Sequence, residues 1–279
     1  MSKGEKMTKK HPFLSHPILF TIILAIVPLQ LSAVLGILTA KLMNVCFHMG
    51  LNSETGTELG SFLACVFRIL LSCVIILLMK RSCGKDFRYG FDGYNLKKGF
   101  LLVSPVLFMA ASNFPEYFLK GGEIKSGLPF AAAFVAGFAP GFFEEVVMRG
   151  SALSNMMYQW RDKKNPVLRS LAVSSLIFGA LHLMNLAHAG VAETLMQVAY
   201  AFGVGFLFGA AYLRTRNIVG PVICHAIVDI SAAIFKLPAD APEVIPFTVA
   251  TSIIITVGGI LIGLWLIRKE KQPEILALF

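Results

Sequence analysis

Two adjacent carboxylates, Glu144 and Glu145, lie near the end of an apolar stretch of this chain, and Arg149 follows four residues after the second. A charge inside hydrocarbon costs between about 2.5 and about 10 kcal/mol, so ionisable residues in apolar segments are functional candidates. Residues four apart share one face of a helix, which predicts an ion pair between Glu145 and Arg149. Glu144 points about 100° away from Glu145 and keeps a carboxylate that suits general-base chemistry.

Two further apolar segments carry histidine. His182 follows Phe178 by four residues in one of them, and His225 precedes Asp229 by four residues in the other. Each feature alone is also typical of simple packing, and the Glu-Glu-Arg patch alone is also typical of a helix end that snorkels to water. Polar positions on three apolar segments, with few elsewhere, predict one common site. Arg68 is the exception, and we expect it to pair with a carboxylate or to snorkel.

The composition places these residues in a membrane protein. Of the 279 residues, 56% are hydrophobic and only 15% are charged, whereas soluble domains have about 25% charged residues. The mean hydropathy is +0.72, and windows of about 20 apolar residues, the length that crosses a bilayer, recur along the chain. The net charge of +9 is therefore assigned to loops near lipid headgroups and not to nucleic-acid binding.

The hydropathy pattern predicts an all-α polytopic membrane protein with eight spanning helices. The third is short and contains Pro105. The expected helices cover residues 17–40, 61–79, 99–114, 127–149, 168–187, 195–213, 217–235 and 245–267.

The distribution of basic residues predicts that both termini are cytoplasmic. With the N-terminus inside, 20 of the 25 lysine and arginine residues fall in inner loops, while four fall in outer ones: Lys41, Lys120, Lys125 and Lys236. Such a bias fixes orientation in membrane proteins. Segment 85–98 mixes aromatic and charged residues, and we expect a turn or a short amphipathic piece at the cytoplasmic interface. The five cysteines show no metal-type spacing and are expected to pack as small apolar side chains.

Three short motifs carry a family resemblance. The run EEVVMRG at 144–150 resembles the EExxxR motif of the CAAX prenyl protease and bacteriocin-processing (CPBP) family of intramembrane endopeptidases. FGALH at 178–182 is similar to its FxxxH motif. HAIVD at 225–229, with a tyrosine, arginine and threonine shortly before it, resembles the final HxxxN or HxxxD motif. All three occur in order on separate predicted spans, which is far more specific than any one of them.

The resemblance implies a glutamate-type endopeptidase. Glu144 with His182 would position and deprotonate a water that attacks a peptide carbonyl, and His225 with residue 229 would stabilise the oxyanion. An ionised Asp229 cannot donate a hydrogen bond, so we expect it to orient His225. Two residues would orient the base and hold the helix end: Glu145 and Arg149.

The resemblance also divides the chain. We expect N-terminal membrane helices in residues 1–126, the CPBP-like catalytic core in residues 127–235, and the last helix with a tail in residues 236–279.

The predicted helix ends leave a mismatch in depth. His182 lies 13 residues, or about 20 Å, beyond Arg169, whereas Glu144 is five residues from the expected end of its helix. The two side chains can meet only if the fifth helix begins in the cytoplasm, tilts strongly or starts elsewhere.

The expected substrates are prenylated CAAX-type or other membrane-associated peptides, reached from the cytoplasmic leaflet. Membrane lipids are the other expected partners, and the lack of organelle signals fits a prokaryotic plasma membrane. No cofactor is expected. A zinc ion held by His182, His225 and Glu144 is the alternative within the same enzyme class, although no HExxH motif is present. A proton-coupled transporter and a non-catalytic immunity protein are the alternatives outside that class.

Overall fold

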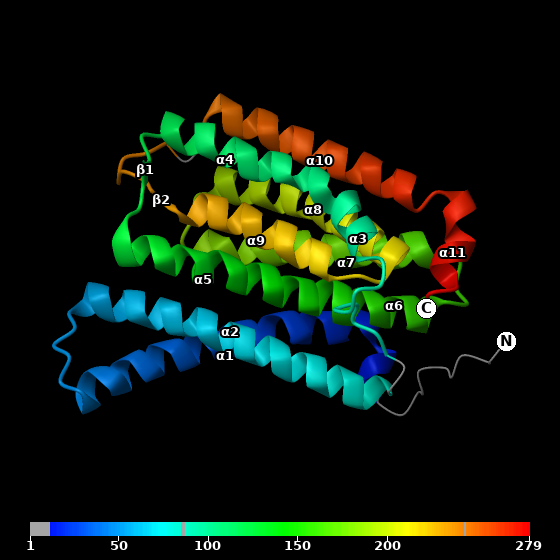
Figure 1. The fold of residues 1–279 in the computed structure, drawn as a ribbon, viewed down its shortest axis with the longest axis horizontal. Helices are drawn as coiled ribbons and strands as arrows, with labels where there is room; N and C mark the ends of the chain where they lie inside the picture. The colour runs from blue at the N-terminus through cyan, green and yellow to red at the C-terminus, as the bar shows by residue number, and fades with distance from the viewer. Residues whose placement is uncertain (1–11, 85–86, 243) are drawn as a thin grey trace.

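The computed structural model describes residues 12–84, 87–242 and 244–279. The chain forms a helical bundle with one short antiparallel pairing of two strands that are distant in sequence (Figure 1). The α-helices and strands, in chain order, are α1 (Pro17–Cys46), α2 (Ser53–Cys83), α3 (Leu96–Val103), α4 (Leu107–Leu119), β1 (Glu123–Ile124), α5 (Gly127–Glu145), α6 (Ser154–Trp160), α7 (Pro166–Leu181), α8 (Val191–Thr215), α9 (Val219–Ala233), β2 (Phe235–Lys236), α10 (Pro246–Leu266) and α11 (Gln272–Leu276).

The expected all-α polytopic membrane protein is confirmed. Each of the eight predicted segments falls on helix, and six helices in the described residues are long and apolar enough to cross a bilayer. The third segment is broken by a 3-10 turn around Pro105, and α9 has only 15 residues. The count of eight crossings and the cytoplasmic termini stay predictions. Lys85 and the lysines before residue 11 lie outside the described residues.

The two ends of the bundle differ. One end, here called the terminal end, carries residues 12–15, the turn at 161–165 and the C-terminal helix α11 (Figure 1). The opposite end, here called the hairpin end, carries the turn at 47–52 and the antiparallel pairing of β1 with β2.

The helix that begins at Gly127 does not end at residue 149 as expected. It continues through a π-helical segment, Val146–Leu153, and through α6 to Trp160, which gives 34 residues in all. Arg149 is therefore an interior residue, 2% exposed, and not a loop cation. The helix can carry it because the expected ion pair with Glu145 is present at 2.9 Å. A left-handed Asn165 before the proline that starts α7 then reverses the chain.

This extension removes the mismatch in depth. Glu144 lies 16 residues before Trp160, and His182 lies 16 residues after Pro166. Both therefore lie about 24 Å from the same turn at 161–165. The antiparallel hairpin of α5–α6 and α7 places the glutamate and the histidine at the same level without special tilt.

Two glycines let α5 and α9 approach closely. A Cβ on Gly137 would lie 2.5 Å from the backbone nitrogen of Ile230, and one on Gly141 would lie 2.8 Å from that of Ala226. Side chains at both positions would push the helices apart. The contact brings the Glu144–Glu145 segment of α5 against the face of α9 that carries His225.

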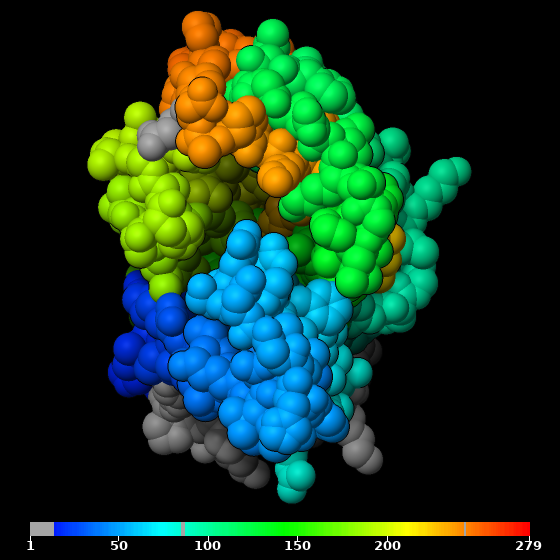
Figure 2. Space-filling model, turned by 90° about the vertical axis from the view of Figure 1, so that its left-hand side faces the viewer, coloured from blue at the N-terminus to red at the C-terminus, as the bar shows by residue number. Residues whose placement is uncertain are grey.

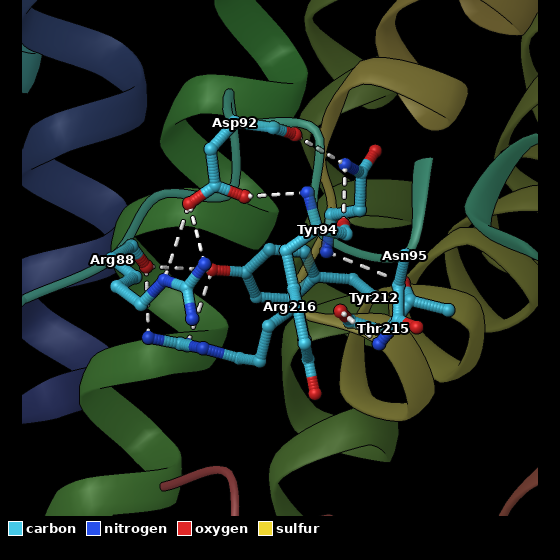
Figure 3. A network of polar contacts seen from close by, with 8 residues as sticks. Arg88, Asp92, Tyr94, Asn95, Tyr212, Thr215 and Arg216 are labelled. Carbon is cyan, nitrogen blue, oxygen red and sulfur yellow. Dashed lines mark hydrogen bonds and ion pairs between the residues drawn. The ribbon is translucent and has the colours of Figure 1, made fainter. Parts of the chain in front are cut away.

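A polar network at the terminal end fixes the register of these helices (Figure 3). The buried Arg216 donates through Nη1 to Ser154 Oγ at 2.9 Å and to Tyr212 Oη at 3.1 Å, and through Nη2 to the carbonyl of Arg88 at 2.8 Å. Its guanidinium also lies 4.1 Å from the ring centroid of Phe279. Five donors on one rigid fork make arginine suited to such a junction.

The position of this junction explains why two distant motifs meet. Ser154 lies nine residues after Glu145, and Arg216 lies nine residues before His225. The contact between Ser154 and Arg216 therefore sets Glu145 and His225 at matching heights on neighbouring helices.

Residues 87–95 form a largely exposed turn beside this junction, in line with the turn or short amphipathic piece that we expected for segment 85–98, and only Phe87, Tyr89 and Gly90 are buried. Asn217 donates to the carbonyls of Asp92 and Tyr94, both at 3.0 Å (Figure 3). Gly90, with φ of 91°, accepts from the backbone of Ile218 at 3.0 Å. Because the Asn217 side chain binds backbone carbonyls, the contact places no demand on the side chains of the loop and leaves no hydrophobic pattern in the sequence. The hydrogen bond from Arg88 lowers the pKa of the Asp92 carboxyl below its usual value.

Candidate active site

The three sequence motifs come together in the middle of the bundle. Glu144 and Glu145 end α5 immediately before the π-helical segment, His182 follows α7 at the start of the 3-10 segment His182–Ala187, and His225 with Asp229 lies on α9. Segments of π-helix inside α-helices are frequent at functional sites. Here, Ser151 and Ser154 donate to carbonyls five residues back, at 2.9 Å and 3.3 Å.

Glu145 is the centre of the buried charge cluster. Its side chain is fully buried, and its Oε1 atom accepts from Arg149 Nη1 and from His225 Nδ1, each at 2.9 Å. The first contact was predicted from the spacing of four residues, whereas the second links residues 80 apart in the chain. Glu145 thus holds the cation of its own helix and the imidazole of α9 in one place.

This contact fixes the orientation of His225. A carboxylate only accepts hydrogen bonds, so Nδ1 of the ring carries the proton and Nε2 faces the other acids. The Nε2 atom lies 3.6 Å from Glu144 Oε2 and 3.7 Å from Asp229 Oδ2. The ring is therefore oriented at Nδ1 by Glu145, a role that we had expected of Asp229. Asp229 instead lies beside the reactive nitrogen.

His182 is oriented in the same sense. Its Nδ1 lies 2.9 Å from the carbonyl oxygen of Phe178, one helical turn earlier. Because a carbonyl can only accept, Nδ1 donates and Nε2 keeps a free lone pair. The FxxxH spacing therefore lets Phe178 contact His182 twice. Its carbonyl accepts the hydrogen bond, and its ring packs against the imidazole with the two ring centroids 5.1 Å apart.

Aromatic rings enclose the cluster. The guanidinium of Arg149 lies 4.6 Å from the ring centroid of Phe178 and 5.4 Å from that of Phe208. The His225 ring packs against the same two phenylalanines at 6.2 Å and 5.8 Å. The two phenylalanine rings exclude water from the Glu145–Arg149 ion pair and restrict the side-chain rotamers of Arg149 and His225. Phe208 is a residue that sequence reasoning missed, because a phenylalanine in a predicted span carries no distinguishing signal.

A cavity of about 950 Å³ opens beside these groups. Glu144, His182, His225 and Asp229 all line it, whereas Glu145 and Arg149 do not. A smaller adjoining pocket of about 70 Å³ has His182, His225 and Asp229 in its wall. Glu144 is 28% exposed and Asp229 29% exposed, so both carboxylates can meet a molecule in the cavity.

The cavity opens at the hairpin end of the bundle. Figure 2 shows a hollow at the centre of that face, between α2, the start of α8 and the region of β2. Its wall there includes Glu116, Lys120, His188 and Glu193. This is the end away from the basic loops. An opening toward the cytoplasmic leaflet, which we expected, and cytoplasmic basic loops therefore cannot both hold, and the orientation stays a prediction.

The cysteines take no part in the cluster. All five are free thiols, as expected for small apolar packing residues. Cys224 is buried next to His225 in sequence, but it does not line the cavity. Among the described residues, no three His, Cys, Asp or Glu side chains are arranged so that they could hold a metal ion.

Comparison with known proteins agrees with this geometry. Residues 126–231 match the family model described as type II CAAX prenyl endopeptidase Rce1-like. This range includes all three motifs and helices α5 to α9. Searches of curated proteins and of solved structures gave no match. The match indicates a peptide-bond hydrolase, and the resemblance read from the motifs is confirmed: residues 126–231 of this polytopic membrane protein match the Rce1-like model of type II CAAX prenyl endopeptidases.

Proposed function

We propose that this protein is an intramembrane endopeptidase in which Glu144 is the general base and no metal takes part. The observation that carries the proposal is the convergence of Glu144, His225 Nε2 and Asp229 within 3.7 Å on the wall of one cavity. Placing three carboxylates and a histidine on two apolar helices costs free energy, because charged groups are poorly solvated in a membrane. Glu144, His225 and Asp229 face a cavity and not the packed core, and chemistry at that cavity explains their presence.

The proposed reaction begins with a water held between Glu144 and His182. Glu144 takes a proton, and the resulting hydroxide adds to the carbonyl carbon of the scissile peptide. The His182 Nε2 lone pair accepts the second hydrogen of the water and orients it. Glu144 then returns the proton to the amine as the C–N bond breaks. A well-placed general base contributes about 10² to 10⁴ in rate.

His225 in its protonated form stabilises the oxyanion. Nδ1 stays bound to Glu145, and Nε2 donates to the oxygen that gains charge in the transition state. An oxyanion donor in a water-poor site contributes about 10² to 10³ in kcat. The carboxylate of Asp229, 3.7 Å from Nε2, stabilises the charge of the imidazolium before substrate arrives. Glu145 and Arg149 position His225 without touching the substrate.

We propose membrane-associated peptides, among them prenylated CAAX-type ones, as the substrates. The family match supports this class, as does a cavity that combines apolar walls with charged groups. The setting we propose is a multi-pass protein of a prokaryotic plasma membrane.

The test is cleavage of a panel of fluorogenic peptides, one of them prenylated, by the purified protein in detergent. We expect Glu144→Gln to lose at least about 10² in kcat/KM, while Glu123→Gln, an exposed glutamate in β1, cleaves as wild type does. A metal chelator should leave wild-type cleavage unchanged. Full activity of Glu144→Gln would show that Glu144 is not the base, and loss of activity with the chelator would favour a zinc mechanism.

A further inference from the structure

Arg68 is a charged residue that the proposed reaction does not use. It lies 15 residues from either end of the 31-residue helix α2. That is about 22 Å from each helix end, which an arginine side chain cannot bridge by snorkelling. Snorkelling to a helix end therefore does not account for Arg68, whose side chain lines a cavity instead.

The expected carboxylate for Arg68 is Asp229, whose charge interacts with that of Arg68 without a direct ion pair. The guanidinium of Arg68 forms no ion pair and no hydrogen bond with any side chain in residues 12–84, 87–242 and 244–279, and its Nε atom is buried without an acceptor. The side chain as a whole is partly exposed, but a buried guanidinium nitrogen without an acceptor is unusual, because polar groups removed from water normally find a hydrogen-bond partner. The only backbone role recorded for this residue is its carbonyl, which accepts from Ser72.

The side chain of Arg68 lines the same cavity as Glu144 and Asp229. The other cation in that wall, Lys120, is already paired with Glu116 at 3.0 Å. Arg68 thus brings a fork of hydrogen-bond donors to the cavity wall from α2, which packs beside α5. Such a fork matches the two oxygens of a carboxylate.

We propose that Arg68 binds a carboxylate of the peptide substrate and so fixes which bond lies against Glu144. The proposal rests on the proposed function and deepens it. The carboxylate is either the C-terminal α-carboxylate of the peptide or an acidic side chain within it, and these two sources can be separated. In this role Arg68 determines specificity and takes no part in proton transfer.

Binding can be measured without cleavage in the Glu144→Gln background. The probe is a fluorescein-labelled peptide with a farnesylated cysteine followed by three apolar residues, made with a free C-terminal carboxylate and with a C-terminal amide. A third peptide has the amide and one glutamate among the three residues. Fluorescence anisotropy gives Kd for each peptide in detergent.

We expect the free acid to bind about tenfold or more tightly than the amide, the effect of one charged hydrogen-bonded contact. The added substitution Arg68→Gln should abolish this difference, and Arg68→Lys should restore part of it. Lys41→Gln, an exposed cation at the hairpin end of α1, should leave it intact. If the glutamate peptide is preferred instead, the carboxylate is an internal one. Thermal unfolding of each variant confirms that it is folded.

Equal binding of all three peptides, or no binding of any, would overturn the proposal, and so would a preference that survives Arg68→Gln. A kcat loss with unchanged KM for Arg68→Gln alone would also overturn it, because it would make Arg68 part of the reaction. Failure of wild type to cleave while the carboxylate preference holds would remove the proposed function and leave the carboxylate site standing.

Discussion

At the scale of single residues, two neighbouring glutamates have different surroundings. Glu145 is fully buried and bound to Arg149 and His225, whereas Glu144 is part-exposed in the cavity. The sequence predicted the Glu145–Arg149 pair from helical spacing. It could not predict that the same oxygen also accepts from His225, because that contact depends on how two helices pack.

The two glutamates should therefore respond differently to substitution. Glu145→Leu leaves Arg149 buried without a counter-charge, and we expect a loss of about 3–5 kcal/mol in the free energy of unfolding. Glu144→Leu should change that free energy by much less. Thermal and denaturant unfolding in detergent would measure both.

A double variant serves as the control. Glu145→Leu with Arg149→Met removes both charges, and stability should recover in part since apolar side chains then fill the site. If Glu145→Leu and Glu144→Leu are equally stable, the buried cluster does not have the energetic role described here.

At the scale of helices, the hydropathy pattern located all eight segments but misplaced one important end. Arg149 resembles a loop cation in a hydropathy plot, because such a plot cannot show that Glu145 neutralises it inside the helix. The turn in segment 85–98 was expected, but its attachment to Asn217 was not: Asn217 binds its backbone carbonyls, and backbone contacts leave no pattern in the side chains. The three motifs were nevertheless enough to predict which helices meet.

The contact between α5 and α9 gives a prediction for Gly137. A methyl group there would meet the backbone of Ile230, so Gly137→Ala should separate the helices and lower both Tm and kcat. Gly258→Ala in α10 is the matched control, since nothing lies within 4 Å of a Cβ there, and alanine in a helix is more stable than glycine by up to about 1 kcal/mol. Equal Tm changes for the two variants would contradict the close approach.

At the scale of the whole molecule, the cavity and the basic loops lie at opposite ends. Loops rich in lysine and arginine stay in the cytoplasm. If the predicted orientation holds, the cavity mouth at the hairpin end faces the outer side of the membrane, and substrates would enter from there. The sequence predicted the charge asymmetry, but the direction of the opening depends on which loops fill the space between helix ends.

The orientation can be tested with cysteine labelling. Cys46 is exposed at the hairpin end of α1, and a cysteine in place of the exposed Lys163 reports on the terminal end. In a background without other cysteines, a membrane-impermeant maleimide should label Cys46 in intact cells and should label Lys163→Cys only after lysis. The reverse pattern would mean that the cavity opens to the cytoplasm.

The size of the cavity has a consequence for the supply of water. A volume of about 950 Å³ corresponds to about thirty water molecules at the density of the liquid. A peptide that fills this space displaces most of them. The adjoining pocket of about 70 Å³ beside His182 and His225 still has room for about two. In the proposed reaction, this pocket is a source for the attacking water that does not require passage through lipid.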